Sequence, residues 1–380
     1  MRFQGLVPET AQTITRSPLS SWDRLNEIVE PKRQFARELV HLDPARFDLR
    51  RGVLGASLVV IPLIVGFALG LAEASVLVTI GALNLLLVQL PSPGVTRWRV
   101  LMVAIVANAG AFGAGTLVGL APVTVEIPLV AVAIFLALLG TRTTEWEGAS
   151  FIAAVMFCFA VGIPPTTLAG VGLRPAAVLL GGIWTLGALS VVQLLWPRYS
   201  TGLEPLTSAA RVAPTSSLRR IVVHSSVVAV TVVVGLIIGL ALGLPRDYWI
   251  MLTVLVALRL DLASTVSYAT ARILGTLLGA GLAFVITTWT ADPWILFPIL
   301  ALTTTLCLAT RGVNYAVYSI WITLTVILIL NLVYSGGPAL AIARIIDTAI
   351  GGTLALVAAI SLSTATRRRS SRSLVATESR

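Results

Sequence analysis

Apolar residues occur in long runs along this chain, and short polar segments separate the runs. The runs are about 17 to 23 residues long, which suits helices that cross a bilayer rather than the ten-residue alternating strands of a β-barrel. Twelve segments are predicted, near residues 52–71, 74–90, 98–120, 126–141, 148–163, 175–196, 221–243, 247–262, 269–289, 293–310, 313–334 and 339–361. The pattern therefore predicts an all-α integral membrane protein with about 12 transmembrane helices.

The longest polar connection divides these segments into two sets of six. Because six is even, both sets insert the same way up, and we expect parallel repeats related by a pseudo-two-fold axis along the membrane normal. The predicted organisation is a cytoplasmic N-terminal arm (1–50), a first six-helix repeat (51–197), a cytoplasmic linker (198–220), a second repeat (221–362) and a basic cytoplasmic tail (363–380).

Short motifs recur between the two sets and support a duplication. GFALGL at 66–71 matches GLALGL at 239–244, and Arg174 matches Arg344 at a similar spacing. Gly181-Gly182 likewise matches Gly351-Gly352. Self-similarity at a nearly fixed spacing indicates a repeated structural unit.

The second segment of each set is unusually short. In the second set, Tyr248 to Leu258 lies between Asp247 and Arg259, and a helix of this length covers about 16 Å, roughly half the hydrocarbon core. In the first set, the corresponding segment is also short and contains Asn84. Short spans at matching positions of two repeats are typical of a transport site.

Small residues follow the short segment on one helix face. Gly275, Gly279 and Ala283 are four residues apart and follow Arg272 closely. Gly115 and Gly119 form a similar stripe in the third segment. Small residues with this spacing allow membrane helices to approach closely, so we predict helix-packing contacts there.

Composition and charge support the membrane prediction and orient the chain. Hydrophobic residues make up 57% of the chain and charged residues 12%, with a mean hydropathy of +0.93, whereas soluble proteins carry about 25% charged residues. With the N-terminus inside, all but three of the 27 Lys and Arg residues fall on the cytoplasmic side, the exceptions being Arg174, Arg246 and Arg344. Both termini are therefore predicted to be cytoplasmic. The basic balance indicates contact with an anionic inner leaflet rather than with nucleic acid.

Few side chains in the predicted spans can carry chemistry. Arg259 and Asp261 form either an anion-attracting gate or a helix end, where the arginine snorkels and the aspartate caps the next helix or pairs with Arg272. Arg344 and Asp347 are three residues apart, which suits an ion pair on one helix face or, less often, a proton relay. No metal-ligand, P-loop or nucleophile motif is present, so we predict neither an enzyme nor a bound cofactor or metal.

One stretch resembles the signature of the FUSC family, the fusaric-acid-resistance-like proteins of the aromatic acid exporter superfamily. The matching residues are Tyr248-Trp249, Thr253, Arg259, Asp261, Arg272 and Gly275-Thr276-Leu277-Leu278-Gly279. The first set lacks the Tyr-Trp pair and the Arg-x-Asp, and the linker is shorter than the soluble domain of longer relatives.

The resemblance implies a permease that exports aromatic or other small organic carboxylates across the bacterial plasma membrane. It also implies kinship with plant aluminium-activated malate transporters, whose anion path lies between two six-span units. The expected path residues are Arg259 and Arg272 near the inner end, Arg174 and Arg344 near the outer end, and Tyr248, Trp249, Thr253, Asp261, Asp347 and Asn84. Arginines along a pore favour anions. The alternatives are a channel-like anion pore and a structural or assembly protein of the membrane that carries no solute. The sequence allows a homo-oligomer but does not predict the oligomeric state.

Overall fold

The computed structural model describes residues 41–88, 95–140, 146–164, 167–196, 218–334 and 336–378. Residues 1–40 of the predicted arm and 197–217 of the predicted linker region lie outside this description, as do the side chains from residue 365 onward. Within the described ranges the chain is helical throughout and contains no strand. A short 3-10 turn, η1 (Pro44–Arg46), precedes twelve α-helices.

The first six helices lie within the predicted first half of the membrane region. They are α2 (Leu49–Ala68), α3 (Ala72–Leu87), α4 (Val95–Val118), α5 (Val123–Gly140), α6 (Glu147–Val161) and α7 (Leu168–Leu195). The other six are α8 (Leu218–Ala241), α9 (Tyr248–Ala257), α10 (Leu262–Trp289), α11 (Pro293–Thr310), α12 (Tyr315–Tyr334) and α13 (Gly337–Glu378). Each helix corresponds to one predicted segment. Three boundaries differ notably: α7 and α10 each begin seven residues earlier than predicted, and α13 continues well past its apolar part.

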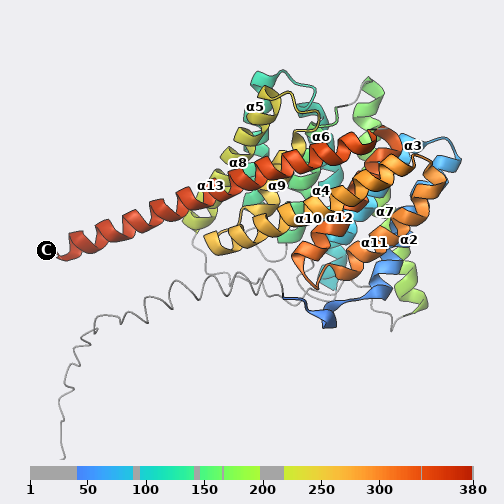
Figure 1. Cartoon of the computed structure of the whole chain (residues 1–380), viewed down its shortest axis with the longest axis horizontal. Helices are drawn as coiled ribbons and strands as arrows, with labels where there is room; N and C mark the ends of the chain where they lie inside the picture. The colour runs from blue at the N-terminus through green and yellow to red at the C-terminus, as the bar shows by residue number, and fades with distance from the viewer. Residues whose placement is uncertain are drawn as a thin grey trace, which may run out of the picture.

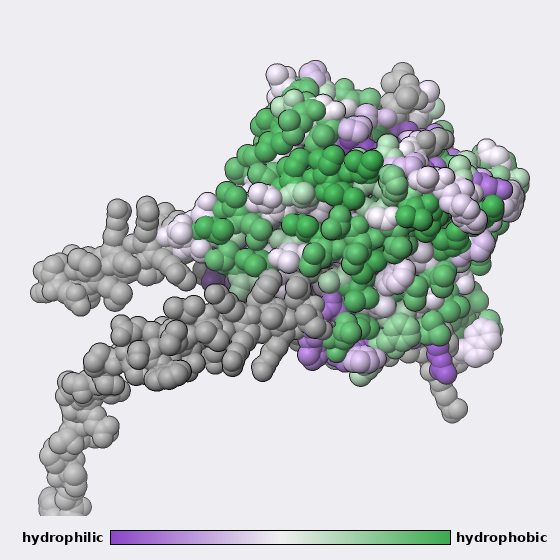
Figure 2. All heavy atoms as spheres, viewed as in Figure 1, coloured by the Kyte–Doolittle hydropathy of each residue, from purple (hydrophilic) through white to green (hydrophobic). Residues whose placement is uncertain are grey.

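Eight of the described helices are long and apolar enough to cross a membrane, and four are shorter apolar helices that include α3 and α9. Apolar side chains cover the middle of the visible face, and hydrophilic ones gather mainly toward its top and bottom (Figure 2). Many large apolar side chains are exposed on this surface. Because a soluble protein does not expose an apolar surface this extensive, the all-helical membrane class predicted from the sequence is confirmed.

The helices pack in a defined set of pairs (Figure 1). Among the first six, α3 packs on α2 and α7, and α4 packs on α6 and α7. Among the last six, α9 packs on α8 and α13, and α10 packs on α12 and α13. Contacts between the two groups join α5 to α8, α11 to α2, α6 to α9 and α12 to α3. The short helix α9 therefore has neighbours on several sides, and most of its residues are buried.

Glycines determine how closely the long helices approach. A Cβ atom added at Gly279 would clash with the Ile320 carbonyl oxygen of α12, and one added at Gly119 would clash with the Val161 carbonyl oxygen at the end of α6. Gly275 and Gly115 lie against the same two neighbouring helices, and Ala283 is completely buried. The two predicted stripes therefore lie where α10 meets α12 and where α4 meets α6.

The repeated GFALGL and GLALGL motifs form the turns that end α2 and α8. Gly70 and Gly243 adopt positive φ angles of 74° and 61°. The Leu71 amide donates to the Gly66 carbonyl over 2.7 Å, and the Leu244 amide donates to the Gly239 carbonyl over 3.0 Å. Such a bond across a left-handed glycine is a common helix stop, because glycine has no Cβ to oppose this conformation.

Arg311 joins the two groups of helices from the loop between α11 and α12. Its guanidinium donates to the Leu86 carbonyl oxygen over 2.8 Å and also to the Leu87 carbonyl oxygen. These carbonyls lie at the end of α3, where they have no partner within the helix. Burial lowers the pKa of Arg311 below the usual arginine value.

Candidate functional site

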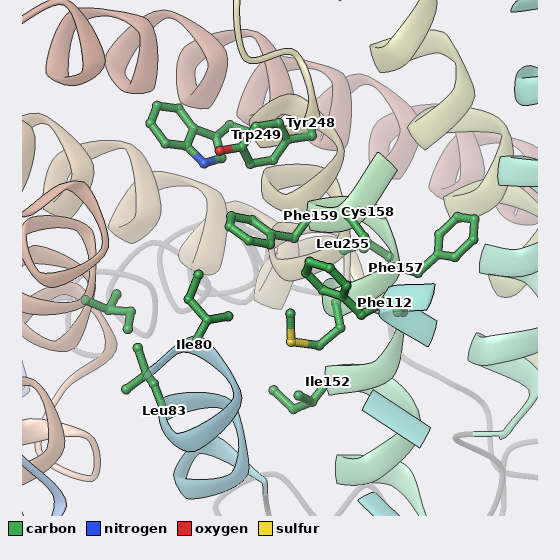
Figure 3. Packing of buried hydrophobic residues seen from close by; sticks show 14 of the residues in the cluster. Ile80, Leu83, Phe112, Ile152, Phe157, Cys158, Phe159, Tyr248, Trp249 and Leu255 are labelled. Carbon is green, nitrogen blue, oxygen red and sulfur yellow. The ribbon is translucent and has the colours of Figure 1, made fainter. Parts of the chain in front are cut away.

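The aromatic pair at the start of α9 lies inside the protein. Tyr248 and Trp249 are 0% and 1% exposed. The Tyr248 ring meets the Phe159 ring of α6 edge-on, with 5.4 Å between ring centroids, and Figure 3 shows both among buried apolar side chains. Tyr and Trp in membrane proteins are usually interfacial anchors, so their burial here marks α9 as part of an internal structure.

One arginine lies beside this pair, and a second arginine is its electrostatic neighbour. Arg344 of α13 is 4% exposed, and its guanidinium carbon lies 5.0 Å from the centroid of the Trp249 ring. Arg272 of α10 is 9% exposed and is an electrostatic neighbour of Arg344. Within the described part of the chain, neither guanidinium has a carboxylate within 4.0 Å. Arg272 Nε and one terminal nitrogen of Arg344 are buried without a hydrogen-bond partner. The structure thus brings together two positive charges that the sequence placed near opposite ends of the membrane.

Asp347 lies one helical turn beyond Arg344. It is 1% exposed, and neither of its carboxylate oxygens has a hydrogen-bond partner among the described residues. The expected Arg344–Asp347 ion pair is not present at 4.0 Å or less in the described structure. The adjacent Thr348 hydroxyl is also buried without a partner. The site therefore contains several buried polar groups whose hydrogen-bonding capacity is unused.

The corresponding arginine of the first half is fully engaged. Arg174 forms an ion pair with Glu73 at 2.6 Å and donates to the Ile163 carbonyl oxygen over 2.6 Å. Asn84 donates to the Ile80 carbonyl oxygen of its own helix over 2.9 Å. Both groups thus have partners within the protein, and the unpaired cations among these predicted residues lie in the second half.

Aromatic rings lead from this site toward Arg259. The guanidinium carbon of Arg259 lies 4.3 Å from the centroid of the Tyr268 ring. Tyr268 and Tyr315 have ring centroids 4.7 Å apart, and Tyr315 is in turn an electrostatic neighbour of Arg344. Neither Tyr268 nor Tyr315 was among the path residues predicted from the sequence. The signal was a tyrosine near the polar start of each helix, which also suits a membrane-interface anchor.

Asp261 and Thr253 have local structural roles. Asp261 is exposed and caps α10 by accepting a hydrogen bond from the Ser264 amide over 2.7 Å, as one of the two interpretations of the sequence proposed. The Thr253 hydroxyl donates to the Trp249 carbonyl oxygen over 2.8 Å, and Gly351 of α13 approaches the threonine side chain closely. Thr253 therefore lies at the contact between α9 and α13.

Asp247 lies just before α9, at the opposite end of the site from Arg259. It is an electrostatic neighbour of Asp347. Burial raises the pKa of Asp247 above the usual aspartate value, although the nearby Tyr248 backbone acts in the opposite direction. Arg246 stacks on the Tyr334 ring with 4.8 Å to the centroid. Charged and aromatic groups therefore continue from the buried arginines to this loop.

The fold and site define a helical membrane protein whose second half contains two buried arginines that have no ion-pair partner among the described residues. Residues 230–358 match the family described as fusaric acid resistance protein-like. This match confirms the FUSC resemblance, and it includes α9 and both arginines. No curated protein and no solved structure matched the chain.

Proposed function

We propose that the protein is a permease for small organic anions, with aromatic carboxylates as the substrate class. The observation that carries this proposal is the pair of buried guanidiniums, Arg272 and Arg344, for which the described residues provide no carboxylate within 4.0 Å. Burying an unpaired charge costs several kcal/mol. Charged groups inside membrane proteins usually pair with each other or face a substrate path. A transported anion would supply the missing negative charge.

The chemistry around the two arginines suits a flat carboxylate. A guanidinium can donate two parallel hydrogen bonds to a carboxylate, which gives geometric selectivity as well as affinity. Trp249, Tyr248 and Tyr315 supply aromatic surface beside the cations. An aromatic body can pack on these rings while its carboxylate binds the guanidiniums. This arrangement is the basis for proposing aromatic carboxylates within the broader class of organic anions.

We propose a path that follows the charged and aromatic groups of the second half. It begins near Arg259, passes Tyr268 and Tyr315, reaches Arg344 and ends near Asp247. The contacts between neighbouring groups support this order. Because α9 has only 10 residues, it cannot span the hydrocarbon core at about 1.5 Å per residue. Its short length brings polar loop residues toward the membrane interior.

We further propose that the two halves are parallel six-helix repeats in a bacterial inner membrane, with both termini cytoplasmic. Most helix pairs in one half have an equivalent in the other, for example α3–α7 with α9–α13 and α4–α6 with α10–α12. The contacts between the halves are likewise equivalent, since α5–α8 corresponds to α11–α2. Gly182 approaches Ile105, and Gly352 approaches Ile273, at matching helix crossings. The placement of Lys and Arg supports the orientation.

A membrane assembly protein without transport activity is the second candidate. The observation that favours it is the packing where α6 meets α9, because Phe159, Tyr248 and their neighbours form a buried apolar cluster (Figure 3). Such packing suits a structural interface. It gives no reason to keep Arg272 and Arg344 buried without counter-ions, however, and a flux measurement separates the two functions.

The test uses purified protein in liposomes and radiolabelled benzenesulfonate, an aromatic anion that stays ionised across the working pH range. Arg272→Gln and Arg344→Gln are each expected to reduce protein-dependent flux by about tenfold or more, since a hydrogen bond to a charged group contributes about 1.5–3 kcal/mol. Arg219→Gln, at an exposed position at the start of α8, is the matched control. Unlabelled aromatic carboxylates should compete with the probe. Equal flux in both site variants and the control would refute the proposed site. Absence of flux in the unmodified protein would refute the proposed function.

A further inference from the structure

The buried carboxylate of Asp347 has no role in the anion site described so far. It is 1% exposed, both of its oxygens lack hydrogen-bond partners among the described residues, and Arg344 precedes it by one helical turn. An ionised carboxylate buried without hydrogen bonds is unfavourable. Next to an anion site it would also repel the substrate. These two facts indicate that the occupied site favours the protonated form.

The ionisable groups around Asp347 and its neighbour Arg344 come from α10, α12, α13 itself and the start of α9. Arg344 of α13 itself and Asp247 before α9 are the electrostatic neighbours of Asp347. The groups next to Arg344 are Arg272 of α10, Tyr248 of α9 and Tyr315 of α12. From α8, His224 has Arg259 as its charged neighbour. Among these groups, Asp347 is the one that is acidic, buried and next to the arginines.

We propose that Asp347 binds a proton together with the anion, so that one proton and one monoanion cross the membrane as a neutral pair. This inference rests on the proposed anion permease. When Asp347 is ionised, its negative charge offsets part of the attraction that the two guanidiniums exert on the substrate. When a proton from water binds to a carboxylate oxygen, this repulsion disappears and the resulting hydroxyl can donate to the anion. Anion binding and proton binding therefore strengthen each other by the same factor.

Proton binding by Asp347 would change which gradients drive the flux of the anion. A lone monoanion responds to the membrane potential, whereas an anion that carries one proton with it moves no net charge. Flux should then follow the combined gradients of anion and proton and should be insensitive to an imposed potential. Apparent affinity should fall by up to about tenfold per pH unit above the pKa of the carboxyl in the empty site, and it should level off above the pKa of the carboxyl in the occupied site.

The experiment measures benzenesulfonate flux in liposomes at several pH values, with and without a potassium-diffusion potential, while an internal pH-sensitive dye reports proton movement. The unmodified protein should move about one proton per anion. Asp347→Asn should abolish proton movement, flatten the pH profile and make flux respond to the potential. Asp347→Glu should restore coupling. Asp247→Asn tests the neighbouring carboxylate, and it should keep about one proton per anion even if its position at the end of the path changes the rate of flux. Asp292→Asn, at an exposed helix cap, controls for the substitution itself and should keep both flux and coupling.

Each outcome decides between the two proposals. Coupled flux in Asp347→Asn, or potential-driven flux without proton movement in the unmodified protein, would overturn the role of Asp347 and leave the permease intact. Loss of coupling in Asp247→Asn alone would assign the proton to that residue and refute the proposal for Asp347. Both proposals would be refuted if the unmodified protein showed no flux, or if Arg272→Gln and Arg344→Gln left the flux unchanged.

Discussion

Replacing Arg344 and Arg174 by methionine should have opposite effects on stability. Methionine keeps much of the side-chain volume and removes the charge. Arg344 loses its stacking on Trp249 (5.0 Å), which contributes about 2 kcal/mol when desolvated. The same change removes the desolvation penalty of a buried charge, which is several kcal/mol. Arg344→Met should therefore leave the free energy of unfolding unchanged or raise it, while flux is lost.

Arg174→Met should instead destabilise the protein. The Glu73 side chain is 56% exposed, so its ion pair with Arg174 contributes at most about 1 kcal/mol. The bond to the Ile163 carbonyl oxygen (2.6 Å) contributes about 1.5–3 kcal/mol, because its donor is charged. The expected loss is about 2–4 kcal/mol.

Thermal unfolding of both variants in the same detergent measures this difference, and liposome flux of the anion probe reports function. A melting temperature that falls for Arg174→Met and holds or rises for Arg344→Met supports a binding role for Arg344. If Arg344→Met lowers the melting temperature as much as Arg174→Met does, Arg344 is a structural group and the central argument for the anion site fails.

Three further predictions concern packing, capping and pH. Gly279→Ala should lower the melting temperature because its Cβ would meet the Ile320 carbonyl, whereas Gly281→Ala, with no atom within 4 Å of its Cβ, should not. Asp261→Ala should cost about 1 kcal/mol of stability through loss of the helix cap, while Asp261→Asn keeps both the cap and the flux; a large loss of flux in Asp261→Asn would restore its role as a gate. Burial raises the pKa of Asp247, so its proton is held more tightly in the folded protein, and the associated stability is lost as pH rises through the folded-state pKa. Thermal unfolding at several pH values should show this loss, and Asp247→Asn should remove that component of the pH profile.

The sequence was sufficient for the helices and for the short span. The apolar run Tyr248–Leu258 matches α9 within one residue, because Asp247 and Arg259 interrupt it sharply, although the predicted segment (247–262) ended five residues too late. Hydropathy placed the start of α10 seven residues too late, at 269 rather than Leu262. Residues 262–268 are rich in hydroxyl side chains, which hydropathy assigns to a loop, yet Asp261 caps a helix there.

That one boundary explains why the site was only partly predicted. With α10 starting at 269, Arg272 falls at the membrane edge, far from Arg344. With the helix starting at Leu262, Arg272 lies ten residues in, which is about 15 Å at the helical rise, and it becomes a neighbour of Arg344. The proximity of these two charges depends on how α10 and α13 pack, which no pattern within either helix reveals. Tyr268 was missed for the same reason.

Arg174 and Arg344, which match each other in the sequence comparison, are paired differently, and this difference supports the proposed function. Asp247 occupies, relative to Thr253, the position that Glu73 occupies relative to Thr79. The first half keeps its acid and Arg174 paired at 2.6 Å. In the second half the acid is partly buried, and Arg344 lies over Trp249 without an ion pair among the described residues. If the halves are repeats, the pairing of the first half shows what this scaffold forms when an arginine stabilises the fold. Arg344 has no such ion pair among the described residues, and two aromatic residues that the first half lacks lie nearby. We expect this change where a repeat unit binds an external anion in place of an internal ion pair.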